Sequence, residues 1–121
     1  MAAVVTAYTK HPVGAGYGIG DWLLQRLTAV VMAVYTVVFV AALLVCAPRT
    51  FSAWQEMFAS PWMRVATLVF LLALLYHAWV GVRDIIMDYI KSTAVRLAAQ
   101  TLVAVTLVAE LAWAIAILWS R

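Results

Sequence analysis

The sequence predicts an all-α membrane protein with three transmembrane helices, on the basis of its composition and of its apolar runs. The chain has 121 residues, of which 68% are hydrophobic, and a mean hydropathy of +1.03, whereas soluble domains are roughly 45–50% apolar. A chain this small has too little interior to bury so much apolar surface, so lipid must be part of its solvent. The apolar residues form continuous runs, which exclude the alternation typical of a transmembrane barrel.

Three runs without Asp, Glu, Lys or Arg, the last interrupted only by Glu110, are each long enough to cross a bilayer once their flanks are included. They cover Leu27–Ala47, Val65–Val82 and Leu97–Trp119, with 21, 18 and 23 residues, and a spanning helix needs about 20. We therefore expect spans at about 22–47, 62–87 and 95–119, within a membrane domain of residues 21–121 that follows an N-terminal segment of residues 1–20.

The connection between the first two spans has its own apolar pattern. Phe51, Trp54 and Phe58 are spaced 3 and 4 residues apart, which predicts an amphipathic turn or short helix at the membrane surface, with the Trp at the level of the lipid headgroups. Pro61 follows, and it suits the first turn of the second span because its missing N–H would be unpaired there.

The distribution of Lys and Arg predicts the orientation. An odd number of spans places the N-terminus and the second loop on one side, and that side holds five of the eight cations. By the positive-inside rule the N-terminus is cytoplasmic. The first 20 residues contain neither a cleavable signal nor an arginine-rich transit peptide, so we expect a bacterial inner membrane.

Several other functions are disfavoured by the sequence. The cations are scattered and form no basic run, so no nucleic-acid surface is expected. The segment GAGYGIG, residues 14–20, lacks GxGxxG spacing and predicts a flexible entry into the first helix. Cys46 has no second cysteine to pair with, and a buried, inert thiol is expected. Without a long soluble segment, any chemistry must be shared with partner chains.

His77 is the most informative polar residue of the second span. On a helix, His77, Gly81, Asp84 and Asp88 fall in one narrow stripe, with Ala73 beside it. The small residues leave room for a flat group or for a closely packed helix. A neutral imidazole is a good iron ligand, but a packing histidine bonded to a backbone carbonyl or to water fits the same pattern. His77 offers one ligand only, so a second axial ligand would come from another chain.

Glu110 interrupts the third span. An acidic side chain at the centre of a spanning helix costs about 2.5–3.5 kcal/mol. We therefore expect Glu110 to be protonated or to contact a neighbouring chain, in preference to serving in a proton relay.

The segment HAWVGVRDIIMDYIK, residues 77–91, resembles the signature of the small cytochrome b-type hydrophobic membrane anchor of succinate dehydrogenase (respiratory complex II). The resemblance rests on His77, Ala78, Trp79, Gly81, Asp88 and Tyr89. It extends to DWLLQRLTAVVMAVY, residues 21–35, which is similar to the start of the family's first helix, and to Arg96 and Gln100 early in the third.

The resemblance implies a role for individual residues. His77 would be an axial iron ligand of a haem b held between this chain and the companion cytochrome b anchor of the complex. Arg26 would face the haem propionates or an anionic lipid head. Tyr89, with Asp88 beside it as the weaker assignment, would lie at a ubiquinone pocket near the cytoplasmic edge. Some relatives carry a histidine where this chain has Gly20, so a propionate contact from that point is not expected.

The resemblance also implies a function and partners. The chain would be a membrane anchor of succinate:ubiquinone oxidoreductase, packing with the companion cytochrome b anchor into a helical bundle and docking the flavoprotein and iron–sulfur subunits. It would serve the tricarboxylic acid cycle and aerobic electron transport, perform no dehydrogenation alone, and belong to complexes that can form trimers. Two alternatives stay open: a fumarate reductase anchor, or a small proton-path or scaffold protein that uses His77, Glu110 and the aspartates.

Overall fold

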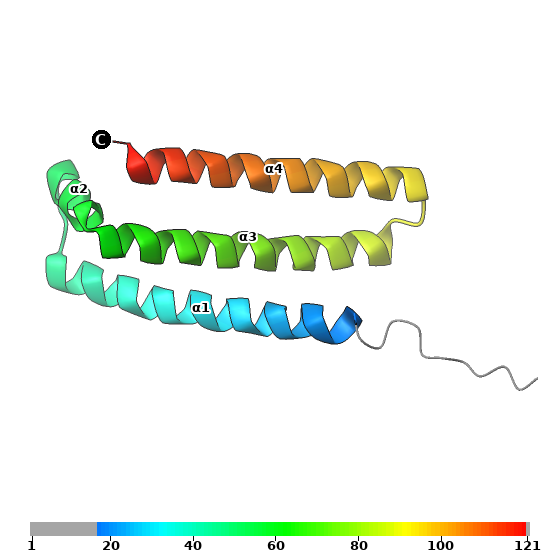
Figure 1. Cartoon of the computed structure of the whole chain (residues 1–121), viewed down its shortest axis with the longest axis horizontal. Coiled ribbons are helices and arrows are strands. Elements are labelled where there is room, and N and C mark those ends of the chain that lie inside the picture. The colour runs from blue at the N-terminus through cyan, green and yellow to red at the C-terminus, as the bar shows by residue number, and fades with distance from the viewer. Residues whose placement is uncertain (1–16, 121) are drawn as a thin grey trace, which may run out of the picture.

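The computed structural model describes residues 17–120, and within this range it contains four helices and no strand. The helices are α1 (Tyr17–Cys46), α2 (Phe51–Ala59), α3 (Pro61–Tyr89) and α4 (Thr93–Trp119) (Figure 1). The three long helices are each long and apolar enough to cross a membrane. The predicted fold class is therefore confirmed, while most of the N-terminal segment predicted for residues 1–20 lies outside the described residues.

The three long helices lie side by side, with α3 between α1 and α4 (Figure 1). This arrangement encloses almost no core, because the buried apolar residues within the described range are three side chains of α3, namely Ala73, Val80 and Ile86. Most large apolar side chains of α1 and α4 are exposed. Lipid or partner helices must cover these surfaces, because a membrane chain has no other apolar environment to place them in.

Local chemistry explains where the helices on one side of the membrane end and begin. The turn after α1 places Ala47 at a φ of 40°, the left-handed conformation in which helices commonly end, and Pro48 cannot continue the helix. The Thr50 hydroxyl then caps α2 by accepting a hydrogen bond from the Ala53 N–H at 3.3 Å. Pro61 occupies the first turn of α3, as predicted. The short amphipathic helix predicted between the spans is confirmed as α2.

Aromatic packing joins α1 and α3 near α2. The Tyr35 ring stacks on Phe70, with ring centroids 4.5 Å apart, and on Phe39 at 5.8 Å. Its hydroxyl lies 2.6 Å from the Thr67 hydroxyl. This cluster fixes the register of the two helices at this end.

Two local predictions were wrong. Helix α1 begins at Tyr17, so Gly18 and Gly20 are helical rather than part of a flexible entry; residues 14–16 lie outside the described range. The helix reaches this far because the next turn is held to α3 through Asp21. Cys46 is exposed rather than buried, because three helices in a row leave most of each helix surface uncovered by the chain itself.

Candidate functional site

His77 lies in the middle of α3, half-buried, and faces α1. Its Nδ1 is 3.2 Å from the Gln25 carbonyl oxygen and 3.2 Å from the Thr28 hydroxyl. The Thr28 hydroxyl has a single proton, which its own helix accepts at Leu24 O or Gln25 O, 2.8 and 2.9 Å away. Both groups can therefore accept from a proton on Nδ1 of His77. This tautomer leaves the lone pair on Nε2, as a metal-binding histidine requires.

Among residues 17–120, the hydrogen-bonding group next to Nε2 of His77 is the Gln25 side-chain amide. The Gln25 amide nitrogen lies 3.4 Å from Nε2, which is long for a hydrogen bond. The other end of the same amide, Oε1, is buried without a hydrogen-bond partner among residues 17–120. Gln25 therefore gains little hydrogen bonding from its present position.

These groups line a cleft of about 520 Å³ between α1 and α3. Apolar walls come from Trp22, Ala29 and Val80. The charged residues Asp21, Arg83 and Asp84 also line the cleft, near the start of α1 and the end of α3. A volume of this size is typical of small-molecule sites, which combine apolar walls with a few polar groups.

Arg83 and Asp21 form an ion pair where the start of α1 meets the end of α3. The Arg83 Nη2 atom is 2.6 Å from an Asp21 carboxylate oxygen and 3.4 Å from the Asp84 carboxylate. The Arg83 Nε atom is buried and has no hydrogen-bond partner in the part of the chain that the structure describes. Because buried donors are nearly always paired in folded proteins, Arg83 has capacity for a further acceptor.

Arg26 lies in the wall of the same cleft as His77. It is exposed, and its guanidinium carbon is 4.5 Å from the centre of the Trp22 ring, a cation–π contact. The structure thus brings together the two residues that the resemblance connected with haem. It adds Asp21, Gln25 and Arg83, for which the sequence indicated no site role.

The two residues expected at the quinone site lie elsewhere. Asp88 and Tyr89 end α3, both are exposed, and Tyr89 has 82% of its surface accessible. Neither lines the His77 cleft, in keeping with the helical rise of about 18 Å between His77 and Tyr89. No contact of the described residues fixes their role.

A second cleft, of about 480 Å³, opens between the end of α3 and the start of α4. Arg96 and Gln100, the third-helix residues that resemble the family pattern, lie in its wall. Asp21 and Arg83 lie in the walls of both clefts, so this ion pair separates them.

Gly81 and Glu110 complete the set of residues singled out in the sequence. A Cβ atom on Gly81 would lie 4.0 Å from the Gln25 amide nitrogen, so the space beside His77 faces α1. Glu110 is exposed on α4, and no ion pair or hydrogen bond links it to another residue in 17–120. Its expected contact with a neighbouring chain stays a prediction.

Together these features define a multi-pass helical membrane protein with a histidine-containing cleft between two of its candidate spanning helices. The family model for the succinate dehydrogenase/fumarate reductase transmembrane subunit matches residues 6–116. The chain is also 39% identical over 102 residues to the succinate dehydrogenase hydrophobic membrane anchor subunit of Coxiella burnetii (strain RSA 493 / Nine Mile phase I), covering 84% of this chain and 89% of that relative. The chain belongs to the family of succinate dehydrogenase/fumarate reductase transmembrane subunits. It is a membrane anchor of this enzyme and is not itself catalytic.

Proposed function

We propose that this chain anchors a succinate:ubiquinone oxidoreductase to a bacterial inner membrane, with its N-terminus in the cytoplasm. In this role it shares a haem b with the companion cytochrome b anchor, contributes to the site of quinone reduction, and docks the iron–sulfur and flavoprotein subunits. The single observation that carries the haem assignment is the environment of His77, whose Nδ1 is held by α1 while Nε2 faces a cleft.

The residues present fit a haem. Nε2 of His77 would ligate the iron once the Gln25 amide, 3.4 Å away, moved aside. Arg26 and Arg83 line the same cleft, and the unpaired Nε of Arg83 would donate to a propionate carboxylate. These charge-assisted bonds suit a guanidinium. A bound haem would supply one-electron transfer, and this chain would contribute the imidazole of His77 and the two cations.

The companion anchor is needed on structural grounds. The three long helices cover only a small part of one another's surface, and large apolar residues are exposed along α1 and α4. His77 would supply one iron ligand, so a second ligand and the opposite wall of the haem site would come from the companion anchor. The large exposed apolar surface also supports the proposal that the chain folds stably only beside another multi-span protein.

Tyr89 and Asp88 are proposed for the quinone site. They lie at the end of α3, on the same membrane edge as Lys91, where water can deliver protons and the neighbouring bilayer can hold an isoprenoid tail. The Tyr89 hydroxyl would donate to a quinone carbonyl, and Asp88 would orient nearby water. The 82% exposure of Tyr89 in the single chain leaves its ring available to a pocket completed by partner chains.

A spectrum and an inventory of the co-purifying chains test this function. The complex that co-purifies with this chain should show a b-type band in a reduced-minus-oxidised difference spectrum, together with a flavoprotein, an iron–sulfur protein and a second anchor. A complex with those components but no such band would refute the haem assignment and leave the anchor role. Preferential fumarate reduction by the intact complex would favour the fumarate reductase anchor, and partners of another kind would favour the scaffold alternative.

A further inference from the structure

We propose that the cleft between α2, the start of α3 and the end of α4 binds the headgroup of an anionic phospholipid, with Arg64 as the phosphate-binding residue. The cleft lies at the opposite end of the helices from Arg83 and Tyr89. It plays no part in the proposed haem and quinone sites, and the inference does not depend on them.

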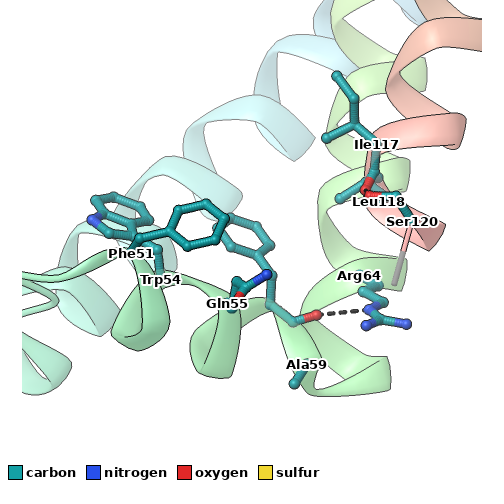
Figure 2. Close-up of a pocket in the computed structure, with 9 residues that line it drawn as sticks. Phe51, Trp54, Gln55, Ala59, Arg64, Ile117, Leu118 and Ser120 are labelled. Carbon is teal, nitrogen blue, oxygen red and sulfur yellow. Dashed lines mark hydrogen bonds between the residues drawn. The ribbon is translucent and has the colours of Figure 1, made fainter.

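The cleft has the shape and lining of an amphiphile site. Its volume is about 640 Å³. Aromatic side chains of α2 form one wall and Ile117 and Leu118 of α4 form the other, with Gln55, Arg64 and Ser120 between them (Figure 2). One cation and two neutral polar groups within apolar walls match a headgroup followed by acyl chains.

Arg64 is held in place, and its charge has no paired carboxylate in the part of the chain that the structure describes. Its Nε donates a 2.7 Å hydrogen bond to the Phe58 carbonyl oxygen at the end of α2, which fixes the guanidinium beneath the end of α4 (Figure 2). Within residues 17–120 no carboxylate lies within ion-pair distance of it, and the cleft lining includes no acidic residue. The remaining nitrogens can bind two oxygens of one phosphate, since a guanidinium presents its donors as a planar fork.

The position of the cleft specifies a lipid. Phe51 and Trp62 are 77% and 84% exposed at this end of the helices, and exposed aromatic residues at a helix end mark the headgroup level of a bilayer. Arg64 lies in the first turn of α3, close to this level, whereas Ile117 lies further along the helices, away from this end (Figure 2). A phospholipid has its phosphate and acyl chains in this same order along the membrane normal.

The local charge favours an anionic lipid over a zwitterionic one. Between residues 47 and 64, this edge carries two cations, Arg49 and Arg64, and one anion, Glu56. Glu56 is exposed and does not line the cleft. A headgroup with a net negative charge is attracted by the net positive charge of this edge, whereas the ammonium group of a choline headgroup would be repelled by Arg64.

The test is a lipid titration of the purified complex. The complex is delipidated in detergent, and native mass spectrometry follows the binding of phosphatidylglycerol and of phosphatidylcholine with the same acyl chains. We expect phosphatidylglycerol to be retained about tenfold more strongly, because both lipids offer Arg64 a phosphate but only phosphatidylcholine adds an ammonium group that this cation repels. Arg64→Gln should abolish this preference. Arg49→Gln, which removes an exposed cation of the same edge outside the cleft, should preserve it.

Two further variants keep the inference falsifiable. If Arg64→Gln prevents assembly, Arg64→Lys retains the charge without the fork, so it should weaken the binding of both lipids and keep the preference for phosphatidylglycerol. Gln55→Trp should fill the cleft and weaken both lipids while leaving Arg64 in place. Equal retention of the two lipids by the unaltered complex would overturn the inference. It would also be overturned if excess inorganic phosphate displaced phosphatidylglycerol, or if a crosslinker at Gln55→Cys captured a partner chain instead of lipid.

Discussion

The contact between α1 and α3 has two ends that differ in how completely their polar atoms are satisfied. Near α2, the Tyr35 hydroxyl pairs with Thr67 at 2.6 Å, and Thr67 also donates to the Met63 carbonyl oxygen at 2.7 Å. Aromatic rings fill the remaining space. Among the described residues, no buried side-chain polar atom at this end lacks a partner.

At the other end, the same two helices leave polar atoms unpaired. Gln25 Oε1 and Arg83 Nε are both buried without a hydrogen-bond partner in residues 17–120, and both belong to residues of the His77 cleft. An unpaired buried polar group costs about 1–3 kcal/mol, so a chain retains it where another group completes the bonding. The aromatic end accounts for the association of the helices, and the polar end is where a further group is expected.

The largest expected effect comes from removing the imidazole at the polar end. His77→Leu should abolish the b-type difference spectrum of the purified complex, because the leucine side chain has no atom that can ligate iron. The chain should still insert, since leucine is favourable within a bilayer. Retention of the unaltered spectrum in this variant would show that His77 is a packing residue that binds Gln25 and Thr28 only.

The next largest effect concerns the membrane edge beyond the polar end. Tyr89→Phe keeps the ring but removes the phenolic donor, so quinone reduction by the complex should lose about 2–4 kcal/mol of transition-state stabilisation. Electron transfer from succinate to a soluble artificial acceptor should be unchanged, and so should the haem spectrum. Quinone reduction at the unaltered rate would leave Tyr89 as an interfacial anchor.

A smaller effect is expected for the ion pair that separates the two clefts. Asp21→Asn leaves Arg83 with only the Asp84 carboxylate at 3.4 Å. Because both side chains of the pair are partly exposed, we expect a loss of about 1 kcal/mol in the free energy of unfolding. A double-mutant cycle with Arg83→Gln, measured on the complex in detergent, isolates the coupling. A coupling energy near zero would mean that the pair does not hold α1 against α3.

The sequence predicted the spans because continuous hydropathy requires no knowledge of tertiary contacts. Family resemblance assigned His77 and Arg26 to one haem site. Both residues line one cleft in the structure, and their role there stays a prediction. The Asp21–Arg83 pair was not predicted. It joins residues 62 positions apart, and their meeting depends on the register of two helices, which apolar runs do not encode.

The same limit applies to Gln25 and to Tyr89. In the sequence, Gln25 is an ordinary polar residue near the start of a helix. Its contact with Nε2 of His77 depends on how α1 packs against α3. A signal was available in retrospect, because amide and guanidinium groups within predicted spans need partners. Tyr89 faces away from the rest of the single chain, so neither the sequence nor the fold of this chain fixes its contacts.

The smallest expected effect belongs to the aromatic end and serves as the matched control for His77. Tyr35→Phe removes one hydrogen bond between α1 and α3 but keeps the ring between Phe39 and Phe70, and Thr67 retains its bond to the Met63 carbonyl oxygen. Hydrogen bonds between membrane helices contribute about 0.6 kcal/mol on average, because partners are also available in the unfolded chain within the bilayer. Thermal unfolding of the complex should therefore shift only slightly, with the haem spectrum unchanged. Loss of the haem band in this variant would mean that the aromatic end sets the geometry of the polar end, and the division of the α1–α3 contact into a structural half and a binding half would be wrong.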